Sequence, residues 1–170
     1  MEGPNLEELQ KNLKHQLTLY RQLVDLLRLE KEHIIGVKLK EIREATYAKE
    51  AILDEIHREE YRRMRWTKEA AAAFGMNESD LTMEIVAERL GDKTQYEPLI
   101  SLRNTLVHLV RKAQEMNLDN KRLTESALKD AQALKRNILG ISSDQPQVYG
   151  PKGNMGSGTR EQARFLSKEA

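Results

Sequence analysis

The sequence predicts an all-α fold: an elongated antiparallel helical bundle of three long helices and one short helix, followed by a flexible C-terminal tail. Charged residues make up 32% of the 170 residues and aromatic residues only 5%, a balance typical of solvated helices rather than of sheets. Apolar residues recur at steps of three or four, and no proline interrupts the chain between Pro4 and Pro98. We therefore expect a helical bundle over residues 1–140 and a tail over residues 141–170.

The first two helices are predicted over residues 5–35 and 37–74, on either side of Gly36. Asn5 is a suitable N-cap, because its side-chain oxygen can accept a hydrogen bond from a free backbone N–H. Gly36 favours a tight turn that makes the two helices an antiparallel hairpin. The positions predicted to face the core are Leu6, Leu9, Leu13, Leu17, Tyr20, Val24 and Leu27, a second stripe of Leu19, Leu23 and Leu26, and then Leu39, Ile42, Ala45, Ile52, Leu53 and Ile56.

A short third helix is expected from the candidate N-cap Thr82 to Gly91, and a long fourth helix over residues 95–139. Pro98 falls in the predicted first turn of the fourth helix, where the missing N–H would have no partner in any case. The near-heptad register of this helix predicts that it lies along the hairpin and buries one seam. The seam consists of Leu99, Leu102, Leu106, Leu109, Ala113, Met116, Asn120, Leu123, Ala127, Leu134 and Ile138.

The composition changes after Gly140. Residues 141–158 contain two of the four prolines and four of the nine glycines, which predicts a flexible segment. Thr159 followed by Gln162 is a capping-box pattern, so a short terminal helix is expected there.

The composition also excludes several classes of function. The absence of cysteine excludes disulfides, thiolate metal sites and cysteine nucleophiles, and no serine stands in a nucleophile-elbow context, so we expect neither an enzyme nor a cofactor. Lys and Arg (28) nearly balance Asp and Glu (27), so a charge-driven partner must be sought locally. The acidic start MEGPNLEELQ and the absence of an 18-residue apolar run predict a cytoplasmic protein with no direct membrane insertion.

Two residue pairs have the spacing of a metal site. Glu30-x-x-His33 and Asp54-x-x-His57 resemble the two-ligand motifs of di-iron bundles. In an antiparallel hairpin the two histidines are separated by roughly 27 Å along the axis, which excludes a shared metal. His15 instead lies at the level of His57, and a two-histidine site with Asp54 stays an alternative, although we expect no bound metal.

Residues 57–68, HREEYRRMRWTK, interleave four arginines with Tyr61 and Trp66. These residue types contact phosphates and stack on bases in nucleic-acid-binding proteins. Glutamates at helical ion-pair spacings surround the same arginines, namely Glu55, Glu59, Glu60 and Glu69. The pattern therefore favours a solvated helix face, and we expect no nucleic-acid partner.

Asn120 occupies a seam position of the fourth helix where an apolar residue would be more stabilising, and Asn117 lies one turn before it. A buried amide at such a position fixes the register of helix pairing. Two roles are open at this point: Asn120 pins the intramolecular bundle, or it holds a partner helix.

Several segments together match the pattern of a known family. They are the leucine-rich first helix running into Leu29 and Glu30, KEAIL at 49–53 leading to Arg62 and Arg63, the helix end at Phe74 and Gly75, MNLDNKRL at 116–123, and YGPKG at 149–153. Over most of its length the chain resembles the flagellar type III export chaperones of the FlgN family. The Asn-x-x-Asn pair and the tail motif Tyr-Gly-x-x-Gly are the most specific elements of this resemblance.

The resemblance implies a cytoplasmic carrier that holds the hook-filament junction proteins FlgK and FlgL and delivers them to the flagellar export gate. The C-terminal helical part of the family binds the client, which implies client-binding roles here for Asn117, Asn120, Leu123, Leu128, Leu134, Ile138 and Leu139. The tyrosine of the tail motif contacts the cytoplasmic domain of the export-gate protein FlhA, which implies gate-binding roles for Val148, Tyr149, Gly150 and Gly153.

A different reading is a self-associating structural coiled-coil protein that dimerises through the fourth helix and has no export client. A homodimer stays open because an apolar seam can close on the hairpin, on a second copy or on a client. A di-metal helical-bundle enzyme is a third reading, and it would require stoichiometric metal.

Overall fold

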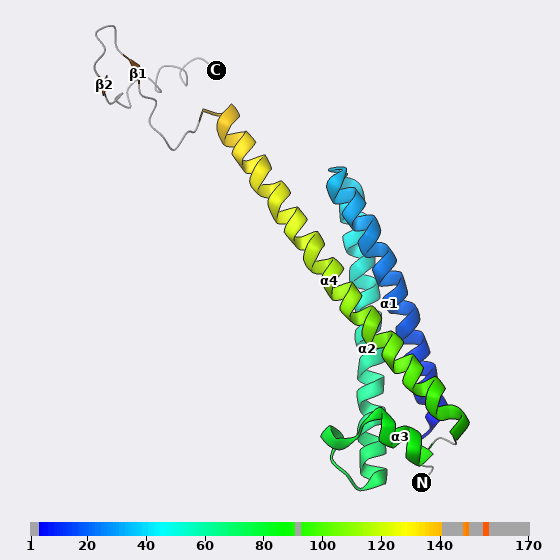
Figure 1. The fold of residues 1–170 in the computed structure, drawn as a ribbon. Helices are drawn as coiled ribbons and strands as arrows, with labels where there is room; N and C mark the ends of the chain where they lie inside the picture. The colour runs from blue at the N-terminus through cyan, green and yellow to red at the C-terminus, as the bar shows by residue number, and fades with distance from the viewer. Residues whose placement is uncertain (1–3, 91–92, 141–147, 150–154, 157–170) are drawn as a thin grey trace. The chain divides into compact units, whose positions relative to one another are not determined.

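The computed structural model describes residues 4–90, 93–140, 148–149 and 155–156. The chain divides into two compact units, Met1–Thr124 and Glu125–Ala170. The described residues confirm the all-α prediction with helices α1 (Leu6–Ile35), α2 (Leu39–Phe74), α3 (Met83–Leu90) and α4 (Lys93–Ile138), and a 3-10 turn, η1 (Glu78–Asp80) (Figure 1). The predicted flexible segment falls largely outside the described residues, and the predicted helix after Thr159 falls wholly outside them.

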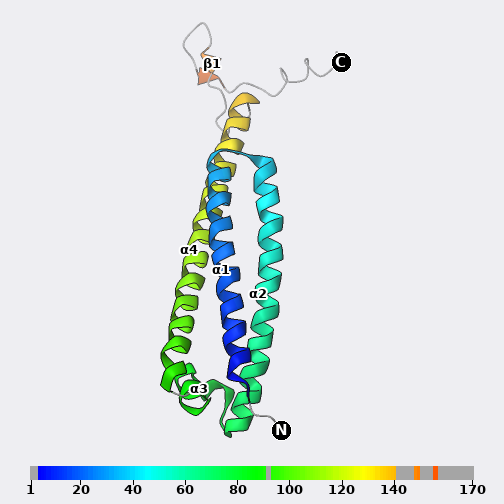
Figure 2. The same ribbon diagram turned by 90° about the vertical axis from the view of Figure 1, so that its right-hand side faces the viewer.

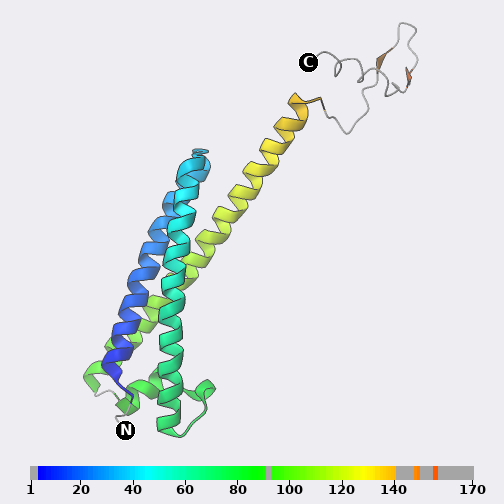
Figure 3. The ribbon, with the colours of Figure 1, turned by 180° about the vertical axis from the view of Figure 1, so that it is seen from behind.

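Helices α1 and α2 form the predicted antiparallel hairpin and lie side by side in all three ribbon views (Figures 1, 2 and 3). The predicted cap Asn5 is confirmed, because its Oδ1 accepts a hydrogen bond from the Glu7 N–H at 2.9 Å. Helix α2 ends at Gly75 with φ 65°, a left-handed conformation that glycine adopts without steric cost.

The turn between α1 and α2 contains Gly36, but the left-handed position that usually holds glycine is the next residue, Val37. The N–H of Lys38 donates to the His33 carbonyl at 2.9 Å, and the N–H of Val37 donates to the Ile34 carbonyl at 3.1 Å. This pair of bonds requires the left-handed conformation at the residue after Gly36. Val37 therefore carries φ 52°, a strained value for a β-branched residue, whereas Gly36 has φ −79°.

The core of the first unit consists of two clusters along the hairpin. The cluster nearer the N-terminus contains Leu6, Leu9, Leu13, Trp66, Ala70, Val86, Ala87 and Leu99. The second cluster contains Leu19, Leu23, Val24, Leu27, Ile56 and Ala113. Both clusters draw residues from α1, α2 and α4, so the part of α4 within the first unit packs along the hairpin, as Figure 2 shows. This confirms the predicted packing of the seam from Leu99 to Leu123, whereas the prediction is wrong for Ala127, Leu134 and Ile138, which are exposed.

The prediction for Leu39 is wrong, because its side chain is 72% exposed. Leu39 is the first residue of α2, and Ile35, the last residue of α1, is 66% exposed beside it in the turn. Leu39 has the periodicity of a core position, but α1 ends at this end of the hairpin. No side chain of α1 is therefore left to cover Leu39.

Helix α3 lies at the end of the bundle that holds the N-terminus (Figure 3). The predicted cap Thr82 is confirmed, since its Oγ1 accepts a hydrogen bond from the Ile85 N–H at 3.3 Å. Helix α4 begins at Lys93, two residues before the predicted start, so Pro98 lies inside the helix rather than in its first turn. No helix within the described part of the chain combines the length and the apolar character that crossing a membrane requires.

The second unit contains two short strands that the sequence pattern does not predict. Strands β1 (Val148–Tyr149) and β2 (Met155–Gly156) pair antiparallel, with Val148 opposite Gly156 and Tyr149 opposite Met155. The tail motif therefore begins on a paired strand.

Candidate partner-binding surface

A buried polar cluster joins the three long helices at the level of Asn120. The Asn120 Nδ2 donates to the backbone carbonyl of Leu27 and to Oε2 of Glu30, both at 2.8 Å. The other carboxylate oxygen of Glu30 accepts from Lys49 Nζ at 2.6 Å, and Lys49 also approaches Oδ1 of Asn117 at 3.5 Å. We call Glu30, Lys49 and Asn120 the polar clasp, because it links α1, α2 and α4.

Asn120 and Glu30 are the deeply buried members of the clasp, whereas the Lys49 side chain is 20% exposed. Asn120 is 3% exposed and the Glu30 side chain 8% exposed. A carboxylate at this depth requires a charged partner and hydrogen bonds, which Lys49 and Asn120 supply. Among the described residues Asn120 Oδ1 is buried without a hydrogen-bond partner, so the amide forms its hydrogen bonds there only as a donor. The geometry favours the first of the two open roles, in which Asn120 pins the bundle, while Asn117 is exposed.

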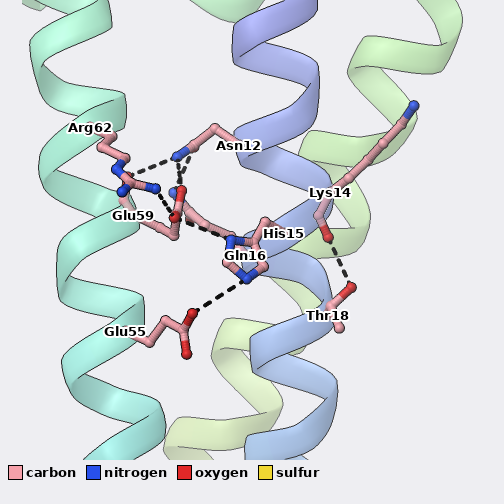
Figure 4. A network of polar contacts seen from close by, with 8 residues as sticks. All are labelled: Asn12, Lys14, His15, Gln16, Thr18, Glu55, Glu59 and Arg62. Atoms are coloured by element: carbon pink, nitrogen blue, oxygen red, sulfur yellow. Dashed lines mark hydrogen bonds and ion pairs between the residues drawn. The ribbon is translucent and has the colours of Figure 1, made fainter.

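A second polar network lies between α1 and α2 around Glu59, whose side chain is 5% exposed (Figure 4). Its carboxylate accepts from Asn12 Nδ2 at 2.6 Å, from Arg62 at 2.6 Å, and lies 3.1 Å from His15 Nδ1. The other ring nitrogen of His15 lies 3.6 Å from Glu55. His15 therefore lies at the level of residues 55–59, as predicted from the hairpin.

No group of three or more histidine, aspartate or glutamate side chains converges as a metal site in the described ranges.

The arginine-rich segment of α2 carries the ion pairs that its spacing predicts. Glutamates one turn away bind Arg62 and Arg63 at 2.6 Å, and the Arg65 pair is longer, at 3.6 Å. The hydrogen bond from Arg63 lowers the pKa of the Glu60 carboxyl below its ordinary value. Trp66 is buried and its Nε1 donates to the Asn5 carbonyl at 3.0 Å, so it offers no face for stacking. A hollow of about 330 Å³ beside these residues is lined by both arginines and glutamates.

The second unit presents an apolar surface on the last part of α4 and on Leu139, the residue that follows it. Leu128, Leu134, Ile138 and Leu139 are 58–74% exposed, and we call these four residues the exposed stripe. Leu134 and Ile138 are one turn apart on one face, while Leu128 and Leu139 are three turns apart on a neighbouring face. Leu134 and Ile138 continue the seam, whose earlier positions are buried or half-buried from Leu99 to Leu123. The seam positions after residue 124 are therefore exposed in the part of the chain that the structure describes.

The residues with an implied client-binding role therefore fall into different environments. Asn120 is inside the bundle, Leu123 is half-buried, and Asn117 and the exposed stripe face solvent. Of the implied gate-binding residues, Val148 and Tyr149 form β1, whereas Gly150 and Gly153 lie outside the described residues.

The partners of Asn120 were not expected from the sequence. Glu30 stands three residues after Leu27 and four before Ile34, both of which are buried positions of α1. An acidic residue at that helical spacing is a signal for a buried ionic contact, and Lys49 in the KEAIL segment supplies the opposite charge.

Comparison with known proteins gives one family match. A family model described as FlgN protein matches residues 1–157. Searches of curated proteins and of solved structures find no match to the chain.

Proposed function

The chain belongs to the FlgN family, whose members are flagellar export chaperones rather than enzymes, and we propose that it carries the hook-filament junction proteins FlgK and FlgL to the export gate. We propose further that the client binds the exposed stripe of α4 and that the tail motif binds the cytoplasmic domain of FlhA. On this proposal the protein works in the cytoplasm, prevents premature assembly of its clients and needs no cofactor.

The observation that carries the client proposal is the exposed stripe. Four large aliphatic side chains, 58–74% exposed, occur within twelve residues, at the end of α4 and in the first residue after it. A free axial protein that assembles through coiled-coil ends exposes an apolar helical face of its own, and an amphipathic helix is the complementary surface. Each aliphatic side chain that becomes covered contributes about 1–2 kcal/mol to the complex.

The residues with an implied client-binding role have different tasks on this proposal, according to where they lie relative to the polar clasp. Asn120 supports binding indirectly on this proposal, because it fixes the register of α4 against the hairpin. Asn117 and Leu123, one turn to either side of Asn120, form the boundary at which a client helix would meet the bundle. The stripe residues supply the contact area.

Tyr149 is the residue that we propose for the gate contact. It lies on β1, opposite Met155, so the pairing of β1 with β2 gives the tyrosine a defined backbone. An aromatic ring provides a large contact area for few ordered torsions, which suits a contact that must form and release quickly. Val148, Gly150 and Gly153 flank it in the proposed gate-binding segment.

Calorimetric titration with C-terminal segments of junction proteins tests the client proposal. The full chain is expected to bind one to one, and Leu134→Ser with Ile138→Ser is expected to weaken binding at least about ten-fold. Leu118→Ser is the matched control, because Leu118 is a 47% exposed leucine on the same helix within the first unit. Equal binding by the stripe variant and the control would refute the assignment.

Titration with the FlhA cytoplasmic domain tests the gate proposal separately. Tyr149→Ala is expected to weaken this binding while the helicity and the thermal midpoint of unfolding stay nearly unchanged. A large fall in thermal stability would instead show that Tyr149 packs on the helices.

The exposed stripe also fits a second copy of the chain, which is the self-associating structural protein considered above. Light scattering across a range of protein concentrations separates the two functions. A concentration-dependent dimer that the stripe substitutions abolish, together with no heat from either client segment, would favour the structural protein.

A further inference from the structure

The turn between α1 and α2 carries an apolar cluster that the chaperone function does not use. Ile35, Val37 and Leu39 are 66%, 70% and 72% exposed within five residues of sequence. We call these three residues the hairpin tip. It lies at the end of the hairpin away from the N-terminus (Figure 1) and belongs to the first unit, whereas the exposed stripe belongs to the second.

Val37 is maintained at the tip against the preference of the backbone. Its φ of 52° is the left-handed conformation that glycine occupies at the end of α2. A β-branched residue is among the least suited to this conformation, and its side chain gains little from the fold because most of its surface faces solvent. An apolar side chain held in a strained, exposed position is better explained by an intermolecular contact than by packing.

The charges around the hairpin tip are mostly positive. Lys31, Lys38 and Lys40 are exposed, while the acidic residues within six positions of Val37 are Glu32 and the half-buried Glu41. Within the described residues, Lys31 and Lys38 take part in no ion pair, and Lys40 makes a long one of 3.8 Å with Glu44. The hairpin tip thus combines a small apolar cluster with lysines on either side of it, although the whole chain is nearly neutral.

The size of the apolar point helps to identify its partner. Three side chains at these exposures offer on the order of 300 Å² of apolar surface, whereas a stable protein interface buries about 800 Å² per partner. A second copy docked tip to tip would therefore lack the area of a stable dimer. Aliphatic side chains flanked by lysines are instead suited to the boundary between anionic headgroups and acyl chains.

We propose that the hairpin tip is a docking site for an anionic phospholipid surface. The aliphatic side chains enter the headgroup boundary, and the lysines contact the lipid phosphates. This contact is peripheral, because no helix has to enter the hydrocarbon. Three side chains and three charges give weak, reversible attachment, which would bring a cytoplasmic carrier to a membrane without holding it there.

Co-sedimentation of the full chain with vesicles tests the proposal. We expect binding to phosphatidylcholine vesicles that contain phosphatidylglycerol, little binding to phosphatidylcholine alone, and a loss of binding at high salt. Ile35→Ser with Leu39→Ser is expected to weaken binding at least about ten-fold. The matched control is Tyr61→Ser with Met64→Ser, since these side chains of α2 are 71% and 58% exposed but remote from the tip.

A further variant separates loss of binding from loss of folding. Val37→Asn removes the apolar side chain but tolerates the left-handed backbone, so the turn is kept. We expect this variant to unfold at a temperature no lower than the natural chain and yet to bind anionic vesicles several-fold more weakly.

Three results would overturn the proposal. They are no sedimentation of the natural chain with anionic vesicles, equal sedimentation of the tip variants and the natural chain, and equal binding to anionic and neutral vesicles. A dimer that depends on the tip residues in light scattering would equally overturn it in favour of self-association.

Discussion

Replacing Asn120 with alanine tests whether the polar clasp fixes the register of α4 against the hairpin. The substitution removes two hydrogen bonds of 2.8 Å, one to the Leu27 carbonyl and one to the Glu30 carboxylate. A bond to a neutral acceptor contributes about 1 kcal/mol and one to a charged acceptor about 1.5–3 kcal/mol. Removal of the unpartnered Oδ1 offsets part of this loss. We expect the free energy of unfolding to fall by about 2–3 kcal/mol.

Urea unfolding followed by circular dichroism measures this change directly. Asn117→Ala is the matched control: the same residue type, one turn earlier on α4, exposed and 3.5 Å from Lys49. We expect it to change stability by no more than about 0.5 kcal/mol. A double-mutant cycle that combines Asn120→Ala with Glu30→Gln should give a coupling energy of about 1 kcal/mol or more.

Two results would refute the reasoning about the clasp. One is an Asn120→Ala variant as stable as Asn117→Ala, and the other is additive behaviour of Asn120→Ala and Glu30→Gln. Either result would mean that the register of α4 is determined by the apolar seam alone.

Two further predictions concern the turns and the response to pH. Val37→Gly should raise the free energy of unfolding by about 1 kcal/mol, because it removes left-handed strain. Gly75→Ala introduces that strain at φ 65° and should lower the free energy of unfolding by a similar amount. Equal effects of the two substitutions in urea unfolding would contradict the assigned turn. Arg63→Met should cost about 0.5 kcal/mol at neutral pH, the value of a half-buried helical ion pair at the surface. The pKa of Glu60 is lowered in the folded state, so the difference in stability between the natural chain and Arg63→Met is complete above pH 4.5. This stability difference should disappear as the pH falls further through the folded-state pKa of Glu60. A stability difference that persists in acid would contradict the pairing.

Local features of the fold could be predicted from the sequence because local rules control them. Asn5 and Thr82 cap their helices as expected, since a side-chain oxygen before a helical pattern satisfies backbone groups wherever the helix packs. Gly75 likewise ends α2 in the left-handed conformation. Gly36 correctly predicts the turn, but the hydrogen bonds of that turn place the left-handed residue at Val37.

Features that depend on neighbouring helices could not be predicted in the same way. Leu39 has the periodicity of a core residue but lies where the facing helix has ended. The seam of α4 keeps its register past Leu123, yet only its first part is covered, and periodicity carries no information on where a covering helix stops. The clasp partners Glu30 and Lys49 are nineteen residues apart, so their ion pair emerges only when the hairpin is built.

Hydrogen exchange with and without a junction-protein segment tests the central claim most directly. Residues 125–138 are helical but present the exposed stripe to solvent, so their amides should exchange readily in the free protein. We predict that the client slows exchange over residues 125–140 and leaves the core of α1 unchanged. Unchanged exchange over residues 125–140 with a bound client, or protection confined to α1 and α2, would contradict the proposal that the exposed stripe holds the client.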